Sequence, residues 1–172
     1  NFSHNQAPTG SALGISMASL VSIQDCAFVS NLANDSAGAV YLDSADAVTV
    51  NACHFESNVA QFGFGSAIWL TASSGVTIQG NRFIGKSAPN GGGAIFWVVS
   101  SGMSVPIGLE DTESNLTMGN YYEGNVAMYG CNLSTDAFAL RLSGNNTYAV
   151  SNYDNYIPEV GVYMVDYYDQ VV

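Results

Sequence analysis

Positive charge is nearly absent from this chain. Its 172 residues include 3 Lys or Arg against 14 Asp or Glu, which gives a formal net charge of -11. A protein this acidic repels phosphate backbones and anionic lipid head groups, so we expect no binding of nucleic acid. No apolar run approaches the ~18 residues of a membrane-spanning helix, and we expect no direct membrane insertion of this segment.

The chain also lacks the composition of a disordered protein. Charged residues make up 10% of it and hydrophobic residues 48%. Disordered segments have the opposite balance, because they cannot bury enough apolar surface to offset the entropy lost on folding. We therefore expect a folded chain of one ordinary domain.

A pattern of roughly 27 residues recurs along the chain. An aromatic residue, two variable residues and Asn (FxxN) form the first half of the pattern, with Lys in place of Asn in the fourth copy. A cluster of small residues before an apolar one forms the second half. The aromatic residues are Phe2, Phe28, Phe55, Phe83 and Tyr122, and the clusters are 10–13, 37–40, 65–68, 92–95 and 130–133. Such an even period without helical patterning is typical of solenoid coils.

Each repeat contains short β-type runs separated by Gly, Ser, Asn and Asp. We expect strands at 12–15, 39–42, 67–70 and 94–97, at 21–23, 48–50, 76–78 and 116–118, and at the aromatic motif. Three such strands per repeat can satisfy their backbone groups only against the neighbouring repeat. The sequence therefore predicts an all-β fold, a parallel β-helix of about five coils.

The repeated motifs have structural explanations. The aromatic residues would stack as a ladder in the core. The Asn of FxxN would adopt positive φ and bind the same residue one coil away, with Lys86 as the exception. Small residues would allow the chain to close a sharp corner.

The paired motifs resemble the repeats of the chlamydial polymorphic membrane proteins and related eukaryotic surface proteins. The resemblance covers about residues 1–133, and Gly92–Ile95 is a literal GGAI. It implies a right-handed parallel β-helix on a cell surface, associated with adhesion and without catalytic residues. It gives no site to transfer.

Alternation along the strands directs three aromatic side chains outward, one above another: Tyr41, Trp69 and Phe96. We predict that they form an exposed contact strip for another protein or for a sugar ring. The alternative is that a long loop or an adjacent domain covers them.

Five Asn-x-Ser/Thr sequons suggest a secreted glycoprotein. They begin at Asn1, Asn34, Asn115, Asn132 and Asn145. We expect N-linked glycans on them, an extracellular or cell-surface location, and partners that are other subunits or domains of the same surface assembly.

Cys26 and Cys53 occupy the same position in consecutive repeats, which Asn81 and Asn120 take later. Residues one coil apart lie within the Cα range of a disulfide, about 4.4 to 6.8 Å. Either a disulfide or a ladder of buried thiols fits this position.

An enzyme is the rival interpretation, because polysaccharide lyases and hydrolases use this fold. Such enzymes need carboxylate pairs, helped by cations or calcium. Asp43 and Asp46 form one close pair, but Ser or Thr takes their places in neighbouring repeats. We therefore expect no catalytic residue, metal site or cofactor.

We predict that residues 1–150 form the β-helix, with an insertion near 98–115, and that 151–172 form a connector and a terminal strand. Phe2 is already in phase with the repeats, so we interpret the chain as part of a longer polypeptide. Residues 160–166 alternate between apolar and polar, which fits either the first strand of an immunoglobulin-like sandwich or a strand that caps the β-helix. The expected function is that of a rigid module of a surface coat, appendage or filament. A carbohydrate-binding module is the alternative.

Overall fold

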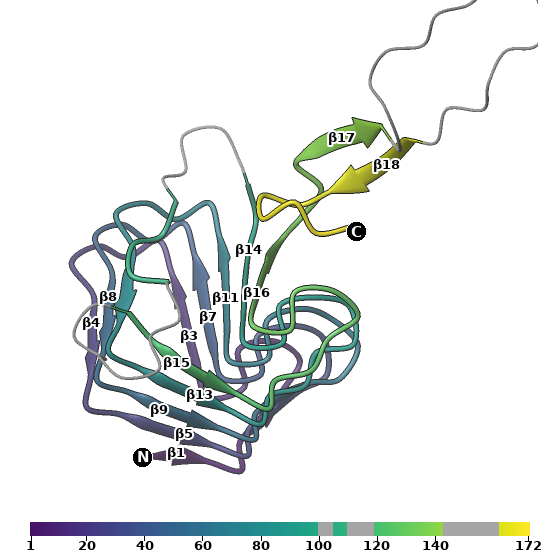
Figure 1. Cartoon of the computed structure of the whole chain (residues 1–172). Coiled ribbons are helices and arrows are strands. Elements are labelled where there is room, and N and C mark those ends of the chain that lie inside the picture. Colours follow the sequence, from purple (N-terminus) through teal and green to yellow (C-terminus); the bar gives the residue numbers. More distant parts are fainter. Residues whose placement is uncertain (100–104, 110–118, 143–161) are drawn as a thin grey trace, which may run out of the picture.

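The chain winds into a parallel β-helix whose coils stack along one axis (Figure 1). The computed structural model describes residues 1–99, 105–109, 119–142 and 162–172. Two five-stranded and two three-stranded parallel sheets form the walls of the coils, and a separate antiparallel pair follows them. The all-β, solenoid prediction is confirmed.

The strands of the first sheet come from the aromatic motif and those of the third sheet follow the small-residue clusters. The first sheet contains β1 (Phe2–Ser3), β5 (Ala27–Val29), β9 (His54–Glu56), β13 (Arg82–Ile84) and β15 (Tyr121–Glu123). The third contains β3 (Leu13–Ser16), β7 (Val40–Asp43), β11 (Ile68–Thr71), β14 (Ile95–Trp97) and β16 (Leu133–Thr135).

The remaining two parallel sheets are shorter. The second contains β2 (Gln6–Ala7), β6 (Leu32–Ala33) and β10 (Val59–Ala60), and the fourth contains β4 (Ser22–Gln24), β8 (Thr49–Asn51) and β12 (Thr77–Gln79). The second sheet was not expected. It arises because the two residues after the FxxN turn also pair with their counterparts one coil away, which makes four strand positions per coil instead of three.

In the fourth sheet, residues 116–118 were expected to continue the ladder, but they lie outside the described residues. Ile107 takes the place beside β12, because it forms a parallel bridge with Thr77 and its carbonyl accepts the N–H of Ile78 at 2.8 Å.

Stacked side chains fill the interior. The inward columns of β7, β11 and β14 are 0–1% exposed at Val40, Leu42, Ile68, Leu70, Ile95 and Trp97. The aromatic residues stack from Phe2 to Tyr122 with ring centroids 4.8–5.2 Å apart and interplanar angles of 6–12°. This spacing equals the distance between strands, so the aromatic ladder is confirmed.

The asparagine of FxxN lies beside the left-handed residue and not at it. Positive φ occurs one position earlier, at His4, Ser30, Ser57, Gly85 and Gly124. The expected bond between coils is present: Asn31 Oδ1 accepts both the backbone N–H and the Nδ2–H of Asn5, and Asn58 Oδ1 does the same for Asn31. The left-handed residue therefore makes the turn. The side-chain oxygen of each asparagine accepts the backbone and side-chain N–H groups of the asparagine in the preceding coil.

The corner motif behaves as predicted. A Cβ atom at Gly38 or Gly93 would collide with a carbonyl oxygen of the next coil, and the hydroxyls of Ser11 and Ser66 donate to the carbonyls of these same two glycines. Only small residues fit so close an approach.

The C-terminal segment returns to the last coil. β17 (Ala139–Leu142) pairs antiparallel with β18 (Val162–Val165), as Figure 1 shows. The Asp166 carboxylate accepts the backbone N–H groups of Thr135, Tyr168 and Gln170 at 2.9–3.1 Å. These contacts favour the capping interpretation over an immunoglobulin-like strand. The expected domain boundary near residue 150 lies outside the described residues.

Within the described ranges, no helix is long and apolar enough to cross a bilayer.

Candidate functional site

The outer face of the third sheet carries the predicted contact strip. β3, β7 and β11 place Gly14, Tyr41 and Trp69 in register, and Phe96 follows on β14. The rings of Tyr41 and Trp69 lie 5.1 Å apart at a tilt of 31°, and both side chains are half-buried. The aromatic column therefore exists, and two of its members reach the surface.

Phe96 is not part of an exposed strip, because it is 3% exposed. The segment that leads into β11 folds over it, and the ring of Phe64 lies 4.4 Å from the ring of Phe96. Gly65 and Gly92 approach the Cβ of Phe96 closely, and Gly91 leaves room for the ring of Tyr129. The prediction of an exposed Phe96 was wrong: it sits in a small apolar cluster outside the main core.

The other end of the column is open. Gly14 is exposed, and a Cβ atom there would meet nothing within 4 Å. Two residues further along the adjacent coil, Asp43 Oδ2 accepts a hydrogen bond from Ser16 Oγ at 3.3 Å and Oδ1 accepts one from Ser44 Oγ at 3.0 Å. Partial burial and the nearby Asp43 carboxylate raise the pKa of the Tyr41 hydroxyl. The carboxylate of Asp43, the ring of Tyr41 and the empty position at Gly14 therefore lie close together.

The sequons differ in accessibility. Asn1 and Asn34 are exposed. Asn132 is half-buried and its Oδ1 accepts a hydrogen bond from Asn125 Nδ2 at 3.0 Å, so its side chain is less accessible than those of Asn1 and Asn34. Asn115 and Asn145 lie outside the described residues.

Cys26 and Cys53 lie in adjacent coils as free thiols. Cys53 Sγ donates to the carbonyls of Ile23 and Asn51 at 3.5 and 3.2 Å, and burial raises its pKa to about 11. The structure therefore has the thiol ladder and not the disulfide.

This column continues as a second asparagine ladder, which sequence reasoning did not identify. Asn120 Oδ1 accepts the backbone N–H and the Nδ2–H of Asn81, both at 3.0 Å, and Asn81 Oδ1 accepts the N–H of Cys53 at 2.8 Å. Both asparagines are 0% exposed. The in-phase column Cys-Cys-Asn-Asn was the available signal.

Lys86 is an unusual buried charge-bearing residue. It is 1% exposed, its Nζ donates to the carbonyl of Ile84 at 2.8 Å, and burial lowers its pKa to about 7, against a smaller opposing effect of Glu56. It lies in the first asparagine ladder between Asn58 and Asn125.

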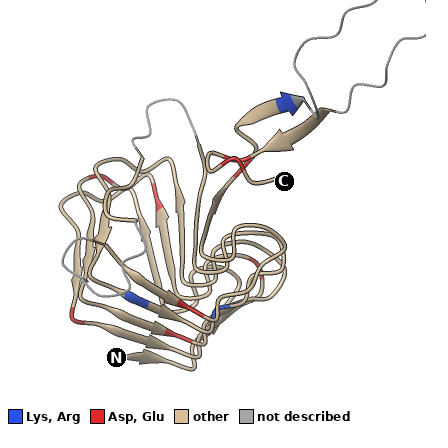
Figure 2. Ribbon diagram, in the orientation of Figure 1, with Lys and Arg blue, Asp and Glu red and all other residues tan. Residues whose placement is uncertain are grey.

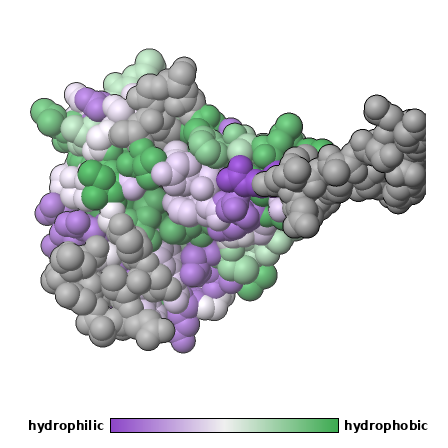
Figure 3. Space-filling model, turned by 45° about the horizontal axis from the view of Figure 1, so that its top comes forward, coloured by the Kyte–Doolittle hydropathy of each residue, from purple (hydrophilic) through white to green (hydrophobic). Residues whose placement is uncertain are grey.

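The acidic residues of the described ranges are spread over several coils and the C-terminal segment (Figure 2). Asp46 accepts a hydrogen bond from the Ser74 hydroxyl, as Asp43 does from Ser16. In the ranges that the structure describes, no group of three or more His, Cys, Asp or Glu side chains is placed to hold a metal ion. On the face of the molecule shown in Figure 3, apolar and polar residues lie side by side.

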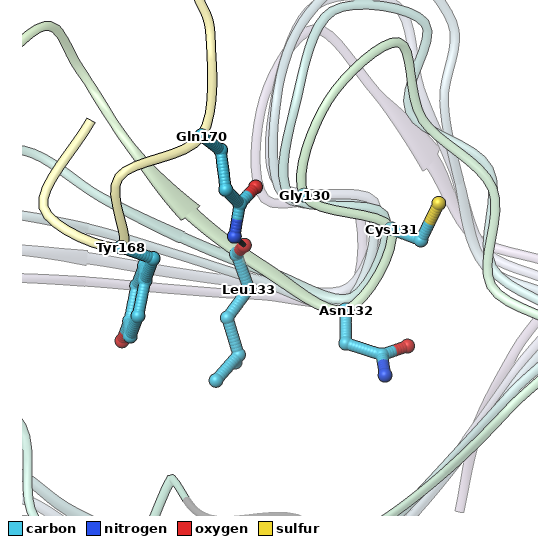
Figure 4. A pocket seen from close by; sticks show the side chains of 6 residues that line it. All are labelled: Gly130, Cys131, Asn132, Leu133, Tyr168 and Gln170. Carbon is cyan, nitrogen blue, oxygen red and sulfur yellow. Dashed lines mark hydrogen bonds between the residues drawn. The ribbon is translucent and has the colours of Figure 1, made fainter. Parts of the chain in front are cut away.

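An open pocket of about 410 Å³ lies between the last coil and the C-terminal segment (Figure 4). Its lining is Gly130, Cys131, Asn132, Leu133, Tyr168 and Gln170. The amide of Gln170 donates to the carbonyl of Leu133 at 3.2 Å across it. The lining contains no charged side chain. We interpret the pocket as the space left where the C-terminal segment packs against the last coil.

Comparison with protein families agrees with the architecture. The family model of the right-handed β-helix region matches residues 1–107, which is more than half of the chain. No curated protein and no solved structure matches this chain. The narrower resemblance to FxxN surface proteins stays a prediction.

Proposed function

Because the chain belongs to the right-handed β-helix family, we propose that it acts as a rigid, non-catalytic structural module of an extracellular assembly. One observation carries this proposal: the repeated motifs are used in contacts between neighbouring coils. The aromatic residues stack at 4.8–5.2 Å, and the asparagines bond from coil to coil. Such ladders resist shear and bending between coils, which suits a spacer in a coat, appendage or filament.

The partners of this module would be other subunits or domains of the same assembly. Tyr41 and Trp69 support this, because they keep part of their ring surface accessible. The carbohydrate-binding alternative relied on three exposed rings, and the burial of Phe96 removes one of them. We therefore give the structural role priority.

Rigidity is tested by spin labels on the first sheet at Ser3 and Glu123, introduced as cysteines in a Cys26→Ser, Cys131→Ser background, because these are the two free thiols that are not buried. Four coil spacings predict a narrow distance distribution, centred roughly 19 Å apart before the length of the labels is added. A broad distribution would show coils that move relative to each other and would contradict the spacer role.

The extracellular location is tested separately in a secretory host. We expect glycan mass on Asn34, whose side chain is exposed, and its loss in Asn34→Gln. Retention of an unglycosylated chain inside the cell would remove the location from the proposal while leaving the rigidity result intact.

A further inference from the structure

A notch interrupts the outward column of the third sheet at its first strand. We call it the Gly14 notch and define it by Gly14, Ser16, Tyr41 and Asp43. Gly14 is in register with Tyr41, and one face of the Tyr41 ring packs on Trp69 at 5.1 Å. The opposite face is therefore on the side of Gly14, where a Cβ would meet nothing within 4 Å, while the backbone of Gly10 lies against the Cβ of Tyr41 at the base of the ring. Strands lie about 4.8 Å apart, which leaves one place for a planar group on the ring.

The notch contains a carboxylate without a cation. Asp43 follows Tyr41 by two residues on the same face of β7, and in the described part of the chain its hydrogen-bond donors are the hydroxyls of Ser16 and Ser44. The three Lys and Arg residues of the chain are all in the described part. Arg141 pairs with Asp169 at 2.8 Å, Lys86 is buried, and Arg82 lies on another sheet.

Arg82 shows what fits such a place. Its guanidinium carbon lies 4.6 Å from the centroid of the Tyr121 ring, and the two residues are in register in adjacent coils. Tyr121 is followed two residues later by Glu123, which accepts the tyrosine hydroxyl at 2.9 Å. Gly14, Tyr41 and Asp43 have the same spacing and register, with glycine in place of the arginine.

We propose that the Gly14 notch binds an arginine side chain of a basic partner protein, with the guanidinium stacked on Tyr41 and its N–H groups donating to Asp43. A planar guanidinium satisfies ring and carboxylate together, whereas an ammonium does not stack. The net charge of -11 attracts a basic partner over longer distances. The inference names the chemistry of a partner and stands whether or not the chain is a structural module.

The test is a titration of the ¹⁵N-labelled protein with the peptide acetyl-Gly-Arg-Gly-amide at low salt, followed through the backbone amides of Gly14, Tyr41 and Asp43. We expect saturable shifts at these amides. The citrulline peptide, which is planar but uncharged, should bind about tenfold more weakly, and the lysine peptide should also bind more weakly. Added salt should weaken binding of the arginine peptide.

Two variants separate the parts of the site. Gly14→Val places a side chain in the notch at a position where a Cβ meets nothing within 4 Å, and valine suits a strand, so the variant should fold and lose the saturable shifts. Asp43→Asn keeps an acceptor but removes the charge, and should weaken binding about tenfold, which corresponds to 1.4 kcal/mol. Ser22→Val, an exposed change on β4, is the matched control and should bind as the unchanged protein does.

Three results would overturn the proposal. The first is no saturable shift at tens of millimolar arginine peptide. The second is equal affinity for the citrulline peptide. The third is saturation of the same amides by a neutral oligosaccharide with no dependence on salt, which would make the notch a sugar platform instead.

Discussion

The backbone N–H of Lys86 donates to Oδ1 of Asn125 at 3.1 Å, so Lys86 occupies an asparagine position without extending the ladder itself. In the neighbouring coils the asparagine Nδ2 reaches back to the carbonyl of the aromatic residue below, as Asn58 does to Phe28 at 2.9 Å and Asn125 to Phe83 at 3.1 Å. The Lys86 amine turns instead to the carbonyl of Ile84. The ladder is therefore broken between Asn58 and Lys86.

Lys86→Asn should repair this break and raise stability at neutral pH. The new Oδ1 would accept from Asn58 and the new Nδ2 would donate to Phe55, while a buried amine would be removed. We expect a gain of about 1–2 kcal/mol, one or two net hydrogen bonds, measured by urea unfolding. A variant less stable than the unchanged protein would show that the Lys86 stem packs better than an asparagine.

The same residue predicts a pH dependence. Its folded pKa of about 7 lies below the ordinary value of 10.5, so between these values the unfolded chain binds the extra proton. Stability from this group is full above about pH 10.5 and is lost as pH falls toward 7. Between pH 7 and about 8.5, below the titration of Tyr41, Cys53 and Tyr129, we expect a slope of up to about 1.4 kcal/mol per pH unit. Lys86→Asn should flatten it; an unchanged slope would assign it to another group.

The second asparagine ladder should contribute strongly to stability. Asn81 Nδ2 donates to the carbonyls of Val50 and Gln79 at 3.0 and 2.9 Å, in addition to its bond to Asn120. Asn81→Ala would leave several buried groups unpaired and should cost about 2–4 kcal/mol in urea unfolding. Asn90→Ala, which removes one bond at a less buried asparagine, is the control and should cost less than about 1 kcal/mol. Equal losses of unfolding free energy in Asn81→Ala and Asn90→Ala would show that the ladder stabilises the protein no more than a single surface hydrogen bond does.

The turn at the aromatic motif offers a matched pair of backbone substitutions. Ser57 and Gly85 hold the same position in adjacent coils with φ of 51° and 61°, and both are exposed. Ser57→Gly should stabilise the protein by about 0.5–1 kcal/mol and Gly85→Ser should destabilise it by a similar amount, because left-handed backbone disfavours a side chain. Thermal unfolding of both variants is the measurement, and changes of the same sign would contradict this explanation.

The sequence predicted the core well because two periods act together in a β-helix. Alternation along a strand directs Val40 and Leu42 inward, and the repeat places Ile68 and Leu70 directly above them. Phe28 and Phe55 stack for the same reason. Both rules are local or follow from the period, so they can be read without a structure.

Contacts that depend on loops could not be read in this way. The alternation of residues along β14 correctly predicted that Phe96 points to the outside of the sheet. It could not predict that Phe96 is buried, because the segment that carries Phe64 folds over that outer face. The position of positive φ was also missed, since His4, Ser30 and Ser57 carry no strong signal for left-handed backbone. In the sequence, the open end of the column is recognisable only because Gly14 replaces an aromatic residue. The structure adds the carboxylate of Asp43, which lies beside Ser16.

The C-terminal cap depends on one buried carboxylate. Asp166 is 1% exposed and accepts three backbone N–H groups, of which that of Thr135 belongs to the last coil. Asp166→Ala would leave these donors unpaired, and we expect a loss of about 2–4 kcal/mol with release of the segment from Val162 onward. Faster amide exchange in 162–172 and at Thr135 would report this release.

Asp169→Ala is the matched control for the cap, because this exposed carboxylate pairs only with Arg141 on the surface. Surface ion pairs contribute little, so we expect a loss of less than about 1 kcal/mol and unchanged exchange at Thr135. If Asp166→Ala left amide exchange at Thr135 as slow as in Asp169→Ala, the three bonds would not be what holds the segment. Exchange at Phe55, in the middle of the aromatic ladder, should stay slow in both variants because the core does not depend on the cap.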